Sequence, residues 1–149
     1  MLFLNYRVYN FNTPISIQSS EGGAIMYKRA NETDAAIALA ADYFKAMIDG
    51  NEEELRRIFH PKASIVGNES NELIFMSLDE FIAITPEAKT GDQPFDYQID
   101  GVAMIGDTAV VTVSNYCFGT WFTDYLSMVI CKGKWRIVAK TFFDHQAAS

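Results

Sequence analysis

The segment from residue 108 to residue 143, TAVVTVSNYCFGTWFTDYLSMVICKGKWRIVAKTFF, constrains the fold more than any other part of the sequence. Apolar and polar residues alternate along it, Val, Ile, Thr and aromatic residues are frequent, and glycines interrupt it. This pattern is typical of consecutive antiparallel strands joined by short turns. With residues 95–105 in front of it, the segment predicts a four-stranded antiparallel meander that supplies most of one sheet.

The turns of this meander predict which side chains share a face. Two-residue hairpin loops favour residues that tolerate a positive φ angle, so we place them at Gly106-Asp107, Gly119-Thr120 and Lys132-Gly133. One face is then almost wholly apolar and must be covered by other elements. Its members are Val102, Met104, Ala109, Val111, Val113, Leu126, Met128, Ile130, Trp135, Ile137 and Ala139.

The same registers predict a polar row at one end of the apolar face, formed by Gln98, Asn115, Asp124 and Thr141, with Asp100 near the sheet edge. An apolar wall with a few convergent polar groups is typical of a small-molecule site. The opposite face mixes polar and aromatic side chains, which suits solvent or a partner subunit. It carries Tyr97, Thr112, Ser114, Tyr116, Thr123, Tyr125, Ser127, Arg136 and Lys140. A register slip of one residue would exchange the two faces.

Composition narrows the class of protein. At 149 residues, with 49% hydrophobic and 21% charged residues, the chain has the size and composition of one globular domain. Its net charge of −7 and its lack of a Lys/Arg cluster argue against a nucleic-acid or anionic-membrane partner. The two histidines and two cysteines, Cys117 and Cys131, lack the spacing of a metal site, so we expect no metal and no cofactor. We expect free thiols rather than a disulfide, which together with the lack of an export signal favours the cytoplasm.

The N-terminal 30 residues lack the basic and long apolar stretches of a signal peptide or a membrane span. Two interpretations remain open: an N-terminal extension, or an arm in which residues 2–11 form an extra strand on this subunit or a neighbouring one. We expect the folded domain to span residues 31–146 and a short tail to follow at residues 147–149. Its first helix is predicted to begin near Thr33, because apolar residues then recur every three or four positions until Gly50.

Capping signals predict two further helices. Asn51 and Glu54 begin the second, whose first-turn carboxylates we expect to be structural, and His60-Pro61 ends it. Residues 63–67 and 72–76 then form a hairpin around NESN. The sequence from Ser77 to Glu80 is a capping box that opens a brief helix, and a Pro- and Gly-containing loop at residues 85–93 leads to the meander.

Three pieces of the sequence carry a resemblance to a known family: DGN followed by FHPKA at residues 59–63, TDYLS at residues 123–127, and KGKWRIVAKTFF at residues 132–143. With the element order, they resemble the nuclear transport factor 2-like superfamily, also described as SnoaL-like or cystatin-like, and within it the branch named putative lumazine-binding. The similarity covers about residues 35–145. It implies an α+β cone, in which a strongly curved antiparallel sheet wraps around a long N-terminal helix and short helices.

What this resemblance implies about function is broad. The superfamily includes isomerases, dehydratases, polyketide cyclases, transport factors and association domains, so the fold does not select one activity. Relatives tend to be homodimers that pair through the outer face of the sheet. The resemblance therefore implies a homodimer here, with the three tyrosines and the polar residues of the outer face as the candidate interface residues.

Asp124 is the leading catalytic candidate. If it is buried beside Asn115, its pKa would be raised and it could act as a general acid or base. The alternative is a strand-end carboxylate that caps backbone amides near the Gly119 turn. His60 could be a second proton carrier facing the interior, or a structural histidine that bonds a backbone carbonyl. His145 is expected to lie in an exposed tail.

Large apolar side chains could form either the core or the lining of a pocket. Most of them are expected to be core, and a subset could form the floor of a ligand site beside Gln98, Asn115 and Thr141. These residues are Tyr43, Phe44, Met47, Phe59 and Trp121.

Three functions remain open from the sequence. The first is binding of a small molecule with an apolar or aromatic ring in a pocket of the cone. The second is a cofactor-independent isomerase, dehydratase or cyclase that uses Asp124, and the third is a non-catalytic dimerisation module. Catalysis would be favoured by a buried Asp124 within about 6 Å of His60 or Asn115 around an open cavity, because paired groups tune each other's pKa.

Overall fold

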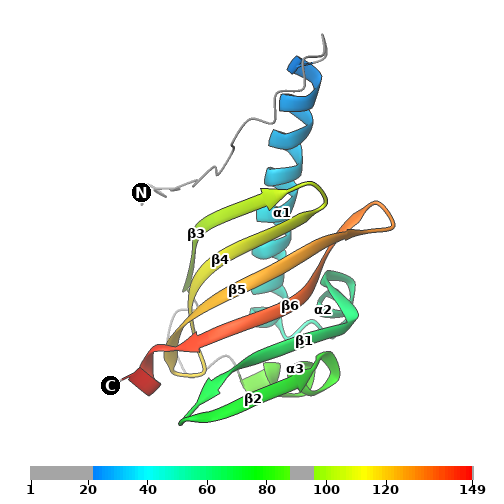
Figure 1. Cartoon of the computed structure of the whole chain (residues 1–149). Helices are drawn as coiled ribbons and strands as arrows, with labels where there is room; N and C mark the ends of the chain where they lie inside the picture. The colour runs from blue at the N-terminus through cyan, green and yellow to red at the C-terminus, as the bar shows by residue number, and fades with distance from the viewer. Residues whose placement is uncertain (1–21, 88–95, 149) are drawn as a thin grey trace.

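The computed structural model describes residues 22–87 and 96–148 (Figure 1). The predicted arm at residues 2–11 and most of the predicted loop at residues 85–93 lie outside them. In chain order the elements are α1 (Gly22–Asp49), α2 (Glu52–Ile58), β1 (Phe59–Glu69), β2 (Glu72–Ser77), α3 (Leu78–Ile84), η1 (Thr85–Glu87), β3 (Asp96–Ile105), β4 (Thr108–Cys117), β5 (Thr120–Cys131), β6 (Lys134–Asp144) and η2 (His145–Ala148).

The strands form one six-stranded sheet in the order β2-β1-β6-β5-β4-β3. The predicted meander is confirmed, because β3, β4, β5 and β6 are consecutive antiparallel neighbours. The sheet is mixed rather than wholly antiparallel, since β1 runs parallel to β6. After the β1-β2 hairpin and α3, the next strand, β3, lies at the far edge of the sheet. The meander then comes back strand by strand until β6 lies beside β1, and the two strands run in the same direction.

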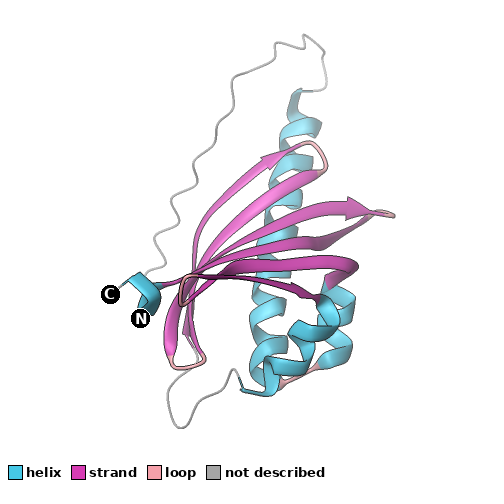
Figure 2. Ribbon diagram, turned by 60° about the horizontal axis from the view of Figure 1, so that its bottom comes forward, coloured by secondary structure: helices cyan, strands magenta, loops and turns pink. Residues whose placement is uncertain are grey.

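The helices lie on one side of the curved sheet, with α1 crossing it and α2 and α3 beside β1 (Figures 1 and 2). The apolar face of the sheet and the helices enclose the core, as the α+β cone requires. Buried side chains from the two layers include Tyr43, Phe44, Met47, Leu55, Ile58 and Phe81 of the helices and Ile65, Val111, Leu126, Met128 and Ile137 of the sheet.

Local signals for the ends of helices agree with the structure. Gly50 has a φ of +59°, which ends α1, and the backbone N–H groups of Gly50 and Asn51 donate to the carbonyls of Met47 and Ala46. The Asn51 side chain accepts a hydrogen bond from the Glu54 N–H at 3.1 Å, as predicted for the start of α2.

Of the predicted starts of α3 and α1, the first is confirmed and the second is wrong. The capping box from Ser77 to Glu80 is formed, with bonds in both directions. The predicted start of the first helix near Thr33 is wrong, because α1 begins at Gly22. Residues 24–32 contain no proline and many good helix formers, so the helix continues N-terminally past the predicted cap.

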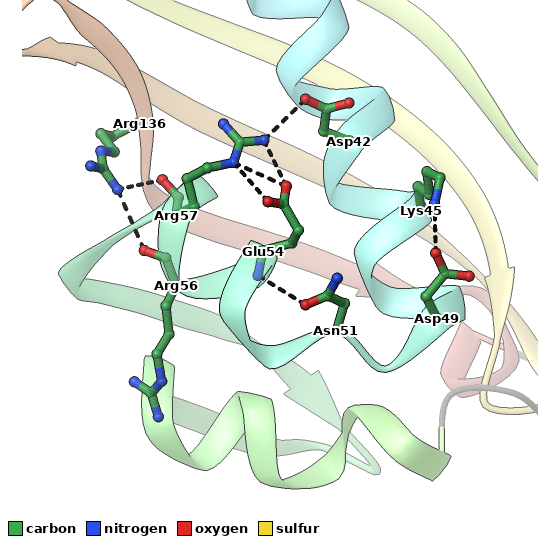
Figure 3. Close-up of polar contacts among 8 residues, drawn as sticks. All are labelled: Asp42, Lys45, Asp49, Asn51, Glu54, Arg56, Arg57 and Arg136. Atoms are coloured by element: carbon green, nitrogen blue, oxygen red, sulfur yellow. Dashed lines mark hydrogen bonds and ion pairs between the residues drawn. The ribbon is translucent and has the colours of Figure 1, made fainter.

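Surface ion pairs and hydrogen bonds of arginine side chains join α1, α2 and β6 (Figure 3). Arg57 contacts Glu54 at 2.8 Å and Asp42 of α1 at 3.2 Å, which links the two helices. Arg136 of β6 donates to the backbone carbonyls of Arg56 and Arg57, which lie in the last turn of α2 and lack an intrahelical donor. These contacts hold α2 against α1 and against β6, an interior strand of the sheet.

Two β-bulges decide which side chains face the core. The β3-β4 register shifts between Ile99 and Gly101, and the β5-β6 register shifts between Ser127 and Met128. Each bulge places one extra residue in one strand, so that every side chain beyond it changes face. The faces predicted from the turns therefore hold on one side of each bulge and are exchanged on the other.

The turn between β4 and β5 differs from the prediction without changing the faces. Its loop is Phe118-Gly119, both with positive φ angles of 51° and 81°, rather than Gly119-Thr120. Moving a two-residue loop by one position shifts the cross-strand pairing by two residues, so Val111, Val113 and Asn115 remain on the core side. Among the described residues, no helix is long and apolar enough to cross a membrane.

Candidate functional site

A buried ion pair lies inside the apolar core. Asp124 of β5 is fully buried, and its Oδ2 lies 3.2 Å from Nζ of Lys140, which extends from β6 and is 6% exposed. The Asn115 side chain of β4 donates to the same Oδ2 at 3.1 Å. Three adjacent strands thus bring a carboxylate, an ammonium and an amide together where the surrounding residues are apolar.

Helix α1 completes this cluster from the opposite side. Lys140 Nζ donates to the hydroxyl oxygen of Tyr43 at 2.8 Å, and Tyr43 is itself fully buried. The ammonium also lies over three rings, 4.8 Å from the centroid of Phe81, 5.5 Å from that of Tyr43 and 5.9 Å from that of Phe142. We refer to Tyr43, Asn115, Asp124 and Lys140 as the polar cluster.

Lys140 belongs to this site because of the β6 bulge. The sequence placed it on the outer face and Thr141 in the polar row, and both placements are wrong. The pairs Met128–Ile137 and Leu126–Lys140 show that one extra residue intervenes, which turns Lys140 inward and leaves Thr141 exposed. The alternation of apolar and polar residues around Lys140 could not reveal its inward orientation, because the extra residue of the bulge lies between Ile137 and Ala139, just before Lys140 in the strand.

The β3 bulge has the same effect on Gln98. Tyr97 pairs with Asn115 and stacks on Phe44, with ring centroids 4.8 Å apart and planes 12° apart. Gln98 is exposed, so its predicted place in the polar row is wrong. Asp100 likewise faces the outer side, where its carboxylate accepts a bond from Ser114 Oγ at 2.6 Å. Tyr97 is thus an aromatic neighbour of the core that the sequence placed on the other face.

The prediction that Asp124 lies beside Asn115 in the core is confirmed. Burial raises the pKa of Asp124, and the nearby Lys140 ammonium, Asn115 and Tyr43 oppose that rise. The alternative, in which Asp124 caps backbone amides, is not supported, because the contacts that its carboxylate makes with the described residues come from the side chains of Asn115 and Lys140. Burial and the Asp124 charge hold the pKa of Tyr43 well above its usual value, so Tyr43 remains a neutral phenol.

One oxygen of the polar cluster has no partner. Asp124 Oδ1 is buried and accepts no hydrogen bond from the residues that the structure describes. Buried polar atoms almost always have a partner, and an unmade bond to a buried carboxylate costs free energy. The described residues therefore leave the hydrogen-bonding capacity of Oδ1 unused.

A thiol extends the cluster on the β4 side. Cys117 is buried and donates to Asn115 Oδ1 at 3.1 Å, which fixes the orientation of the Asn115 amide toward Asp124. Burial raises the pKa of Cys117 to about 12, so the thiol is protonated and unreactive at neutral pH. Both Cys117 and Cys131 are free, as predicted.

The predicted aromatic and apolar lining residues divide into two groups. Tyr43, Phe44, Met47 and Phe59 are fully buried, and Tyr43, a member of the polar cluster, lies 4.6 Å from the ring of Phe44 and in edge-to-face contact with Phe59 at 5.5 Å. Trp121 is 45% exposed and contacts Tyr116 near the β4-β5 turn, on the outer side of the sheet. Whether any of them binds a ligand stays a prediction.

The histidines lie apart from the polar cluster. His60 is half-buried at the start of β1, and its Nδ1 accepts a bond from the Lys62 N–H at 3.1 Å. It thus contacts the backbone, through an N–H group rather than through the carbonyl that was expected. His145 is exposed in η2, and its Nε2 lies 2.8 Å from Thr123 Oγ1. Within residues 22–87 and 96–148, no three His, Cys, Asp or Glu residues are grouped as a metal site requires.

Comparison with known proteins now defines the family. Residues 31–143 match the family described as "Putative lumazine-binding". The chain belongs to this family. The match ends at the last residues of β6 and includes both bulged strands, so the polar cluster lies wholly within the family domain.

Individual relatives agree with this assignment. An aldolase of Cladobotryum, FrzH, is 32% identical over 118 residues, which are 78% of this chain and 94% of that protein. An NTF-2 like protein of unknown function from Silicibacter pomeroyi is 35% identical, with a TM-score of 0.73 over 78% of this chain and 98% of that one. A similar protein of unknown function from Shewanella baltica is 19% identical, with a TM-score of 0.70 over 78% and 95%. The cone fold of the nuclear transport factor 2-like superfamily is therefore established for this chain.

Proposed function

We propose that this protein binds a small molecule with an apolar or aromatic ring at the polar cluster and moves a proton of that molecule through Asp124. The observation that carries the proposal is the unpartnered, buried Asp124 Oδ1. An apolar interior with one free acceptor, beside a cation at 3.2 Å, suits a ligand that presents a polar group at the end of an apolar body.

The chemistry of the cluster supports proton transfer beside a carbonyl. A carboxylate whose pKa burial raises is a better base than an ordinary one, and Asp124 is such a carboxylate. Lys140 and the Tyr43 phenol are donors that could stabilise negative charge developing on a carbonyl oxygen. The relative named as an aldolase is compatible with this proposal, because aldol chemistry requires proton removal next to a carbonyl.

The experiment combines binding and exchange. We would screen aryl ketones and polycyclic ketones by thermal shift, because a ligand that binds only the native state raises the melting temperature. Each hit would then be incubated in deuterium oxide, and loss of the proton beside its carbonyl would be followed by NMR. Asp124→Asn should abolish the exchange, whereas Asp79→Asn, an exposed carboxylate paired with Arg56 at 2.7 Å, should leave it unchanged.

Two results would count against the proposal. If no ketone raises the melting temperature, the cluster is a structural ion pair of the core. If ketones bind but Asp124→Asn exchanges the proton as fast as wild type, then Asp124 is not the base and the protein is a binding protein only.

We further propose that the outer face of the sheet forms a homodimer. The exposed aromatic residues Phe75, Tyr125 and Phe143 lie on this face, at 68%, 48% and 49% exposure. The pairs Phe75–Val66, Val66–Thr141 and Thr141–Tyr125 form one continuous row across four strands. A contiguous apolar patch of this kind favours association. The free thiols of Cys117 and Cys131 support the reducing cytoplasm as the location of the protein.

Sedimentation velocity tests the dimer. Wild type should sediment as a dimer at micromolar concentration, and Tyr125→Glu should sediment as a monomer because a charge would be buried at the interface. Ile105→Glu is the matched control, since Ile105 is 79% exposed at the β3-β4 turn, away from the aromatic row. A monomeric wild type would contradict the proposal.

A further inference from the structure

The Lys140 amine is a nucleophile held beside a proton acceptor, and its surroundings differ from those of the exposed lysines. Its Nζ is buried, lies 3.2 Å from Asp124 Oδ2 and donates to the Tyr43 hydroxyl at 2.8 Å. For contrast, Lys45 forms a 2.7 Å pair with Asp49 on the surface of α1, where its side chain is 78% exposed. Both lysines have a carboxylate partner, but only Lys140 has it in the core.

Burial changes what this pair can do. An ion pair in an apolar interior loses the hydration of two charges, and transfer of one proton from the ammonium to the carboxylate removes both charges. The product is a neutral amine beside a carboxylic acid. A lysine amine that is desolvated in a hydrophobic pocket can act as a nucleophile toward carbonyl compounds.

We propose that Lys140 forms a covalent Schiff base with an aldehyde or ketone bound at the polar cluster. This inference rests on the proposed function, because it uses the same ligand site, and it names the reactive group of the ligand. Asp124 is the proton acceptor and later the proton donor. Tyr43, a neutral phenol that contacts Nζ, positions the amine and the carbonyl oxygen.

The steps balance without any oxidant or cofactor. Asp124 takes a proton from the Lys140 ammonium, and the nitrogen lone pair attacks the carbonyl carbon while the C=O π pair moves to oxygen. The new ammonium gives a proton to that oxygen, which yields a neutral carbinolamine. The Asp124 acid then protonates the hydroxyl, water leaves, and the nitrogen lone pair forms the C=N bond of an iminium ion. The net change is ammonium plus ketone to iminium plus water, and the regenerated Asp124 carboxylate pairs with the iminium.

The side chains around Nζ also indicate the polarity of the ligand. The rings of Phe81 and Phe142 lie 4.8 Å and 5.9 Å from the ammonium, so a carbonyl carbon that reaches Nζ lies among aromatic side chains. An aryl ketone places an apolar ring there. A sugar or another highly hydroxylated carbonyl compound would lose its hydration without finding enough polar partners.

The test uses 1-phenylbutane-1,3-dione, an aryl diketone whose Schiff base rearranges to a stable enaminone. Full-length wild type should gain one near-ultraviolet enaminone band and a mass equal to the diketone minus one water. Peptide mapping of the wild-type adduct should place it on Lys140. Lys140→Met should lose the band, and Lys45→Arg, the surface control, should retain it in full.

Each result decides the inference. A single adduct on Lys140 supports it, and mapping on wild type does not depend on whether the variant folds. No adduct, or adducts spread over surface lysines, overturns it. The melting temperature with the same diketone separates the two proposals: a rise without an adduct removes the Schiff base and retains the binding site, whereas neither a rise nor an adduct counts against both.

Discussion

Replacing Lys140 with Met should destabilise the folded protein by about 3–5 kcal/mol, because the change leaves the Asp124 charge buried without its partner. In the wild type, Lys140 Nζ lies 3.2 Å from Asp124 Oδ2. At an effective dielectric constant of about 20, two unit charges at this separation attract by about 5 kcal/mol. Met retains most of the apolar stem of Lys, so the substitution removes mainly the ammonium and its two polar contacts.

The pH dependence of this loss has a defined sign. Burial raises the pKa of Asp124, and the charge of Lys140 is the largest influence opposing that rise. Without Lys140, native Asp124 holds its proton well above the ordinary aspartate pKa of about 3.9, which describes the unfolded chain. The native state then binds more protons than the unfolded state, so stability falls as pH rises through this window. The deficit of Lys140→Met should therefore shrink as pH falls through the raised pKa of native Asp124 toward the ordinary aspartate value.

The assay is urea unfolding followed by tryptophan fluorescence, with a double variant and a surface control. Lys140→Met/Asp124→Asn should recover most of the lost stability, because it removes the unpaired charge. Lys45→Met breaks an exposed pair with Asp49 and should unfold close to wild type. Equal losses in the single and double variants would refute the reasoning, since the damage would then lie in packing.

Three further predictions concern packing, capping and the thiols. Gly67→Ala should cost about 1–3 kcal/mol in urea unfolding, because a Cβ at Gly67 would lie 2.5 Å from the Phe142 ring; unchanged stability would mean that the ring moves freely. Ser77→Ala should cost about 1 kcal/mol by removing the cap of α3, and Ser77→Asp should restore most of it. Cys117, whose pKa burial raises to about 12, should react with iodoacetamide at neutral pH far more slowly than the half-buried Cys131, and mass spectrometry should find the two labelled alike only after unfolding.

Local chemistry was sufficient to predict most of the elements. The Gly50 stop, the Asn51 cap and the Ser77 capping box depend on bonds within a few residues, so they can be recognised without the rest of the molecule. The four-stranded meander follows from alternation and turn residues. A loop displaced by one residue, as at Phe118-Gly119, keeps the faces intact, which makes this kind of prediction tolerant of small errors.

The candidate site was predictable only in part. Asp124 and Asn115 were assigned correctly because they lie on strands joined by a tight turn, with no bulge between them. Lys140 was missed, and Gln98 and Thr141 were misplaced, because each lies beyond a bulge. A lysine on an alternating strand gives no local signal that it points inward, and only the presence of Asp124 and Tyr43 opposite makes its burial tolerable.

The sequence by itself thus determined the order of elements, the ends of the short helices and the family, since these depend on neighbouring residues and on recognisable motifs. The tertiary structure alone decided the parallel pairing of β1 with β6 and the two bulges. A bulge supplies the curvature that a sheet needs to wrap around a helix, and that demand comes from the packing of distant segments. For this reason the charged centre of the protein, in which β4, β5, β6 and α1 meet, exists only in the folded chain.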